Sequence, residues 1–223
     1  MGWSACSDAM IIPLKPGELQ RLIPAVASGP QFSFCSGNPQ KILQRVLISV
    51  IGGVIALLIA QSQFSYRFGS IWLVAGFVLL LYVLWGPILE AGRKNATLRR
   101  YPKAALYEAR VGDLFTKELV EQRKEQADQR GRLELVENRR TWLSLELEDD
   151  DGYLGSVRFP MEKKHKTIRR GMVVRGLVLS ERPDFSRIDA MSDAWIPQLK
   201  AWVGEYPYLL RPAFEELCLR RLR

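Results

Sequence analysis

The chain has 223 residues, of which 48% are hydrophobic and 25% are charged, and its formal net charge is +8 at pH 7. One histidine is too few for a histidine-based metal site, and the scattered thiols of Cys6, Cys35 and Cys218 form neither a disulfide framework nor a paired zinc-ligand motif. The positive charge is compatible with nucleic acid as a partner, but the basic flanks of a membrane protein account for it more simply.

The first 40 residues are expected to form an N-terminal cytoplasmic segment. The start of the chain lacks the basic region and apolar core of a cleaved signal peptide, and Met10 is an alternative start. Pro16 precedes a short amphipathic helix over residues 17–23, whose apolar side chains share one face. Glycines and prolines then indicate a loop over residues 29–39.

Two long runs without a charged residue organise the chain, Val46–Tyr66 and Phe68–Leu89, and Arg67 separates them. As a helix that rises about 1.5 Å per residue, each run covers the ~30 Å hydrocarbon core of a bilayer. Neither run has the polar face that a helix of a globular protein shows to water. The sequence therefore predicts a hairpin of two transmembrane helices within residues 41–90.

Small side chains recur every four residues along the first predicted span, at Gly52, Ala56 and Ala60. Such a stripe permits close contact between helices, and Ala75 and Gly76 are the expected facing residues in the second span. Another membrane protein could occupy the same groove instead. Neither span contains an ionisable side chain, the usual sign of an ion or proton pathway, so we do not expect a self-contained transporter or pump.

The distribution of positive charge predicts the orientation of the hairpin. Basic residues precede the first span and follow the second; they are Lys41, Arg45, Arg93, Lys94, Arg99, Arg100 and Lys103. Because positively charged flanks stay on the cytoplasmic side, both termini are expected in the cytoplasm. The second helix is expected to bend near Pro87 and to continue as a helical linker over residues 91–103.

From residue 104 to residue 223 the pattern changes from helical to alternating, which predicts a cytoplasmic β-rich domain. Strands are expected over residues 104–111, 131–136, 143–147, 153–159 and 172–180. An Asp150-Asp151-Gly152 turn joins the third and fourth of these. The charged run Glu121–Arg130 cannot bury a face and is expected to be a mobile loop.

The predicted fold class is therefore a membrane helical hairpin with a mainly-β domain. This domain is either a small antiparallel barrel of the OB or SH3 kind or an open sheet. Pro212 can begin a C-terminal helix after the last strand.

The β-rich domain offers few candidates for catalysis. His165 has Lys and Arg neighbours in sequence, which disfavour the imidazolium, and no carboxylate is expected to orient its ring. The acidic run Glu146–Asp151 matches no calcium-loop spacing and fits a solvated hairpin tip better than a Ca²⁺ or Mg²⁺ site. No glycine-rich phosphate loop occurs. We therefore expect no enzyme activity, no metal and no cofactor.

The best candidate for a binding surface is a basic cluster of five residues: Lys163, Lys164, Lys166, Arg169 and Arg170. It could meet anionic lipid headgroups, RNA or an acidic patch on a protein, and each Lys or Arg near an anionic surface contributes on the order of 1 kcal/mol. An exposed basic turn between strands, without a partner, explains the same pattern. RNA is the least favoured ligand, because no aromatic side chains alternate with these charges to stack on bases.

Three segments near the C-terminus carry a resemblance to a known family: Val178–Ile188 (VLSERPDFSRI), Ser192–Pro197 (SDAWIP) and Tyr206–Leu209 (YPYL). Over these residues the chain resembles a family of small cyanobacterial two-span membrane proteins that are usually labelled phosphate ABC transporter permease. The resemblance extends from Met10 to the C-terminus. It implies a thylakoid or plasma membrane with the soluble domain in the cytoplasm, and it assigns no catalytic or binding residues.

A permease needs a polar pathway, usually built from several helices per subunit, and two apolar helices do not provide one. We expect instead a non-enzymatic membrane-anchored module that docks a protein partner, for assembly or maintenance of a membrane protein complex. The alternative is an accessory subunit of a membrane transporter. In the first case a partner should copurify after mild detergent extraction. In the second case deletion should change solute uptake while the levels of membrane complexes stay normal.

Overall fold

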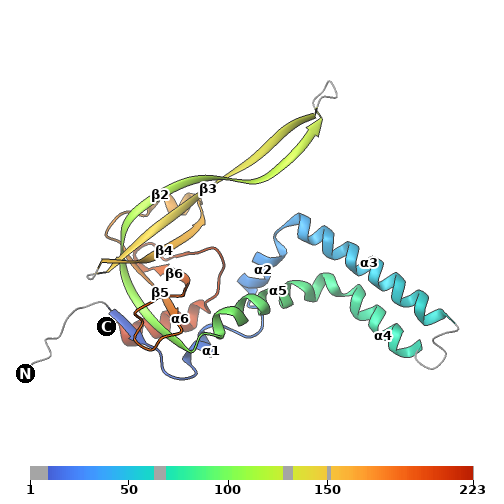
Figure 1. The fold of residues 1–223 in the computed structure, drawn as a ribbon, viewed down its shortest axis with the longest axis horizontal. Helices are drawn as coiled ribbons and strands as arrows, with labels where there is room; N and C mark the ends of the chain where they lie inside the picture. The colour runs from blue at the N-terminus through green and yellow to red at the C-terminus, as the bar shows by residue number, and fades with distance from the viewer. Residues whose placement is uncertain (1–9, 63–68, 128–132, 150–151, 223) are drawn as a thin grey trace, which may run out of the picture. The chain divides into compact units, whose positions relative to one another are not determined.

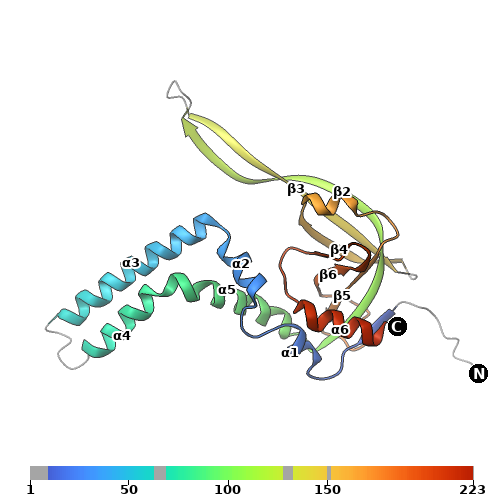
Figure 2. The ribbon, with the colours of Figure 1, turned by 180° about the vertical axis from the view of Figure 1, so that it is seen from behind.

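The computed structural model describes residues 10–62, 69–127, 133–149 and 152–222. The chain divides into two compact units. The helical unit is Gln20–Arg100, and the β-unit combines Met1–Leu19 with Tyr101–Arg223. Figure 1 and Figure 2 show the chain from opposite sides.

The helical unit is built from helices that the sequence pattern predicts only in part. Its described helices are α2 (Gly29–Ser36), α3 (Pro39–Gln61), α4 (Gly69–Leu80) and α5 (Tyr82–Arg99). The short helix expected over residues 17–23 is α1 (Glu18–Leu22), which runs from one unit into the other. The expected helical linker over residues 91–103 is the last part of α5, which ends at Arg99.

The prediction of a loop over residues 29–39 is wrong, because α2 occupies most of this range. The N–H of Ser28 donates to Gln31 Oε1 over 3.0 Å, and a proline lies in the first turn, where its missing N–H is not needed. On the buried side of α2, Gln31 and Asn95 of α5 exchange two hydrogen bonds of 3.1 and 3.0 Å. The glycine and proline that indicated a loop therefore begin a helix.

Helix α3 is long and apolar enough to cross a membrane. Asn38 Oδ1 accepts the N–H of Gln40 over 3.0 Å, and Pro39 follows as the first helical residue, which together make a strong helix start. Eleven of its large apolar side chains are more than a third exposed, and Leu58 is 63% exposed. This helix contains most of the first predicted span, Val46–Tyr66.

The second predicted span, Phe68–Leu89, is not a single straight helix. Only together are α4 and α5 long and apolar enough to cross a membrane, and they meet at Leu81 with a bend of 72°. We expected the bend near Pro87. A proline ring clashes with the carbonyl four residues before it, here that of Val83, so the distortion falls on the preceding turn. Within the described residues, one helix is of spanning length, and a second span is present only if the bent pair counts as one.

Two side chains bind backbone groups that the bend releases. Ser49 Oγ of α3 accepts the N–H of Val83 over 3.1 Å, and the indole N–H of Trp85 donates to the carbonyl of Val78 over 2.9 Å. In an unbroken helix both backbone groups would bond to residues one turn away. These two bonds give both groups a partner in place of the one that the bend removes.

Small side chains let α3 and α4 pack closely. A Cβ atom on Gly76 would lie 3.3 Å from Ala56 Cβ and 3.6 Å from the carbonyl oxygen of Gly53. A Cβ atom on Gly53 would lie 2.5 Å from a methyl group of Leu80. The close packing of α3 against α4 at this level therefore depends on glycine, and small residues play the same role where helices pack tightly in membranes.

The β-unit is a curled antiparallel sheet that forms a half-barrel (Figure 1). Its strands are β1 (Met10–Pro13), β2 (Lys103–Ala127), β3 (Leu133–Asp149), β4 (Gly152–Pro160), β5 (Val173–Ser180), β6 (Ala190–Ile196) and β7 (Ala201–Val203). The strand order is β4-β3-β2-β5-β6-β7, and β1 also pairs with β2. The structure therefore confirms the prediction that this part of the chain is a mainly-β domain.

Alternation along the strands places one face of the sheet in the core. Leu145 of β3 and Val157 and Phe159 of β4 are buried together, as the alternating runs predict. The turn residues Asp150 and Asp151, on which the predicted hairpin depends, lie outside the described residues. The flanking strands β3 and β4 nevertheless pair as expected.

Strands β2 and β3 continue beyond the rest of the sheet as a two-stranded ribbon (Figure 1). Their pairing extends as far as Ala127 opposite Leu133. The prediction of a mobile loop over Glu121–Arg130 is therefore wrong for residues 121–127, which belong to β2. Residues 128–130 lie outside the described part of the chain. Charged residues argue against burial but not against a strand, because a ribbon pairs through backbone hydrogen bonds and needs no buried face.

The C-terminal helix α6 (Arg211–Arg221) forms as predicted and lies beside the N-terminal strand (Figure 2). The guanidinium of Arg221 pairs with Glu18 over 2.8 Å and donates to the carbonyl of Pro13 over 3.0 Å. Residues 10–13, which we expected in a separate N-terminal segment of residues 1–40, are thus a strand of the β-unit.

Replacing Gly76 with leucine should destabilise the helical unit, because the new side chain must displace Ala56 and separate α3 from α4. Overpacking of this kind costs about 1–3 kcal/mol. Thermal unfolding of the full chain in detergent micelles measures the change. Val74→Leu is the matched control, because Val74 lies on the same helix and is 64% exposed. Equal losses in both variants would contradict close packing through Gly76.

Candidate functional site

The basic cluster lies on an exposed turn that follows β4. Three of its residues belong to the 3-10 helix η2 (Lys163–Thr167), and the other two lie in the segment after it. All five basic side chains are exposed. Their positive charge therefore faces solvent, where a partner can reach it.

Two of these cations are paired with neighbouring carboxylates. Lys164 binds Glu162 over 2.9 Å, and Arg170 binds Asp113 of β2 over 2.5 Å. A hydrogen bond from the N–H of Leu114, helped by Arg170, holds the pKa of Asp113 below its ordinary value. The hydrogen bond from Lys164 lowers the pKa of Glu162 in the same way.

The other three cations, Lys163, Lys166 and Arg169, make no ion pair with any carboxylate in the described part of the chain. No carboxylate within the described ranges therefore neutralises their charge. Complementary charge of this kind gives an interface its specificity and speeds association.

His165 and Ile168 fix the basic turn to the core. Both are buried. The N–H of Glu162 donates to His165 Nδ1 over 3.1 Å, and the imidazole contacts the Phe159 ring edge-on with 4.7 Å between centroids. Burial lowers the pKa of His165, and Lys164 acts in the same direction. The neutral imidazole thus anchors the turn, which agrees with the expectation that its surroundings disfavour the imidazolium.

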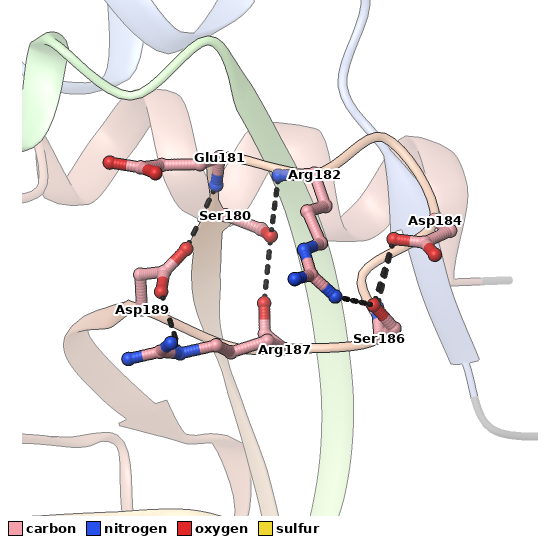
Figure 3. Close-up of polar contacts among 7 residues, drawn as sticks. All are labelled: Ser180, Glu181, Arg182, Asp184, Ser186, Arg187 and Asp189. Carbon is pink, nitrogen blue, oxygen red and sulfur yellow. Dashed lines mark hydrogen bonds and ion pairs between the residues drawn. The ribbon is translucent and has the colours of Figure 1, made fainter.

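The loop between β5 and β6 is held together by its own polar groups (Figure 3). Ser180 Oγ accepts the N–H of Arg182 over 3.0 Å and donates to the carbonyl of Arg187 over 2.7 Å. Asp189 accepts the N–H of Glu181 over 2.9 Å, and its other oxygen pairs with Arg187 over 3.2 Å. These bonds join the two ends of the loop.

The tip of the same loop is fixed by a short-range contact (Figure 3). Asp184 accepts the N–H of Ser186 over 3.2 Å and its hydroxyl over 3.1 Å, which lowers the pKa of Asp184. Phe185 between them has a positive φ of 52° and packs against the core. Among the residues drawn there, no histidine joins the serine and the carboxylate, so the pair is not a hydrolytic triad.

A buried carboxylate, Asp193 of β6, is the feature that the sequence analysis missed. Asp193 is 4% exposed, and its Oδ1 accepts the N–H of Leu209 over 3.0 Å. Gly204 approaches so closely that a Cβ atom there would lie 2.8 Å from that of Asp193. Burial raises the pKa of Asp193 to about 7, against the opposing hydrogen bonds from backbone N–H groups. The carboxyl therefore holds the segment after β7 against β6.

Tyr107 of β2 is fully buried and pairs in register with Gly176 of β5. A Cβ atom on Gly176 would lie 2.7 Å from the hydroxyl oxygen of Tyr107. Burial and the charge of Asp193 raise the pKa of Tyr107. A sequence signal for this polar centre does exist, since an acid in the middle of the strand AMSDAWI must find hydrogen bonds when it is buried.

The predicted helix-packing residues lie along α3 and α4. Gly76 is next to Ala56, whereas a Cβ atom on Gly52 would meet Leu79 at 3.4 Å. The carbonyl of Ala60 lies 3.5 Å from the Cβ position of Gly69. The shortest of these Cβ distances is at Gly53, 2.5 Å from a methyl group of Leu80, and the spacing of small residues did not indicate this position. Within the described ranges, no three His, Cys, Asp or Glu side chains gather as metal ligands.

Asp193 should make the protein less stable as the pH rises through neutrality. A carboxyl whose pKa is about 7 when folded and about 4 when unfolded binds more protons in the folded state, so a rising pH favours unfolding. Between pH 6.5 and 8 the loss should be about 1 kcal/mol. His165, with its lowered pKa, acts in the opposite sense only below about pH 6.5.

Thermal unfolding of the full chain at several pH values in this window measures the effect. Asp193→Asn should flatten the profile, because the amide oxygen still accepts the N–H of Leu209 but does not titrate. Parallel profiles for the two proteins would show that Asp193 is not the titrating group.

One family model matches residues 12–223, and it describes a family of unknown function, DUF8619. The search of curated proteins and the search of solved structures each gave no match. The matched region includes the whole helical unit, the basic turn and the buried centre at Asp193. The chain therefore belongs to the DUF8619 family.

Proposed function

We propose that the protein is a non-enzymatic, membrane-anchored interaction module that docks a partner protein of a membrane complex. In this proposal α3 and the bent pair α4–α5 form a two-span anchor, and both termini face the cytoplasm. The β-unit presents its basic turn to the partner. The membrane is a cyanobacterial thylakoid or plasma membrane, as the resemblance of the sequence implies.

The exposed apolar surface of α3 and α4 is the observation that carries the proposal. Eleven large apolar side chains of α3 and seven of α4 are more than a third exposed, among them Val74 and Phe77 at 64% each. Removing such a partly exposed side chain from water stabilises the protein by about 1 kcal/mol. Leaving all of them in water would therefore cost more than the ~5–15 kcal/mol of net stability that a typical domain has. Lipid removes this cost.

A layer of ion pairs supports the same placement. Arg45 of α3 pairs with Glu90 of α5 over 2.5 Å and donates to the carbonyl of Cys35 over 3.1 Å, while Lys41 pairs with the same carboxylate. From Arg45 to Gln61 the helix rises about 24 Å, close to the thickness of a hydrocarbon core. Paired charges at this level fit a membrane boundary, and the basic residues that flank it favour the cytoplasmic side.

The basic turn is the surface that we assign to the partner. Lys163, Lys166 and Arg169 project from a turn that His165 and Ile168 fix to the core, so little ordering of the backbone is needed on binding. Three exposed cations on a fixed turn, without an ion pair to any described carboxylate, complement an acidic patch on another protein. Anionic lipid headgroups offer the same charge and are the competing ligand.

Replacing Lys163 and Lys166 with glutamine should weaken docking about tenfold, because each exposed charge pair contributes up to about 1 kcal/mol. The measurement is affinity purification from native membranes in mild detergent, with the bound proteins quantified by mass spectrometry. Lys103 and Lys117, both exposed on β2, are replaced with glutamine in the matched control. Binding to vesicles with and without anionic lipid separates the protein partner from the lipid.

Equal recovery of every bound protein by both variants would contradict docking through the basic turn. If deletion of the protein changed solute uptake while membrane complexes stayed at normal levels, the accessory transporter subunit would be the better description.

A further inference from the structure

We infer that the first part of α5, Tyr82–Leu89, lies along the boundary between lipid headgroups and acyl chains instead of crossing the bilayer. In this arrangement α4 supplies the depth of the second pass, and the chain turns into the plane of the membrane at Leu81. The inference rests on the proposed membrane anchor and goes beyond it, because it assigns a lipid-binding role to a particular segment.

Ser49 marks the depth of the bend. Its hydroxyl binds the N–H of Val83, just after Leu81. Ser49 is four residues from Arg45, which corresponds to about 6 Å of helix rise. Amphipathic helices that bind membranes sit about 5–10 Å into the headgroup and acyl boundary. If the ion pairs of Arg45 mark the membrane surface, the bend falls at the depth of an interfacial helix.

The size of the bend sets the direction of the chain after Leu81. Helix α5 leaves α4 at 72°, so each of its residues advances only about 0.5 Å along the direction of α4, against about 1.5 Å in a straight helix. Between Leu81 and Ile88 the depth should therefore change by about 3 Å instead of about 10 Å.

The side chains of this segment suit the boundary layer. Leu84 is 59% exposed and Ile88, one turn later, is 38% exposed, so they form an apolar pair on one face of the helix. Tyr82 and Trp85 contact each other edge-on with 4.8 Å between ring centroids, and these two residue types are enriched at membrane interfaces. Glu90 then begins the polar part of α5.

The bend is also specified by the sequence. The released groups of Val83 and Val78 are bound by Ser49 and Trp85, and Pro87 has no N–H to offer the carbonyl of Val83. A span that needed only to cross the bilayer would require none of these three residues.

Spin-label depth measurements on the full chain test the inference, in vesicles of phosphatidylcholine and phosphatidylglycerol. Single cysteines replace Leu81 and Ile88 in one pair of variants, and Ile71 and Val78 of α4 in the matched control pair. Members of each pair are seven residues apart, and all four side chains are more than a third exposed. Cys35 and Cys218 are buried and stay in place, whereas the cysteine near the N-terminus is replaced with serine.

The expected result is a depth difference of about 3 Å for the pair at Leu81 and Ile88 and about 10 Å for the α4 pair. A difference of about 10 Å for both pairs would overturn the inference and leave the membrane anchor intact, because it indicates a straight second span. Control labels that collide with a water-soluble nickel reagent rather than with oxygen would contradict the anchor itself. Labels on α5 that are shielded from both reagents would indicate a protein on this face and overturn the assignment to lipid.

Discussion

A polar group that is removed from water must find a hydrogen-bond partner, and this constraint explains how the buried polar side chains of the helical unit are arranged. Ser49 binds the backbone N–H of Val83 at the bend, and Arg45 and Glu90 neutralise each other between α3 and α5. The buried amides of Gln31 and Asn95 bind each other. Each of these groups would be costly to leave unpaired away from water. The polar contacts therefore hold the helices together at sites where water is excluded.

The same constraint separates the roles of the two units. Residues 46–66 and 68–89 contain no Asp, Glu, Lys, Arg or His, so they fit the proposed anchor better than a conduit. In the β-unit, polarity is used to fix loops. Asp193 binds the segment after β7, and His165 holds the basic turn against Phe159. A turn fixed in this way can present exposed cations to a partner, which is the chemistry that the proposed function needs.

Local patterns in the sequence predicted the helices and strands in which apolar residues recur with a clear period. The apolar run of α3 and the alternation in β3 and β4 are of this kind, and so is the helix that begins near Pro212. Features that depend on residues distant in sequence were missed. Ser49 and Val83 fix the position of the bend, β1 reaches its place by pairing with β2, and Leu209 satisfies the buried Asp193. The ribbon beyond Val120 was missed because its charged composition suggested a loop, whereas strand pairing uses the backbone.

Insertion of α3 and α4 into lipid can be tested directly by extraction of membranes with alkaline carbonate, which strips peripheral proteins and leaves integral ones in the pellet. The full chain, expressed with its β-unit intact, should remain in the membrane pellet and be released only by detergent. Release into the alkaline supernatant would contradict a membrane anchor and would require a protein partner to cover the apolar surface of both helices.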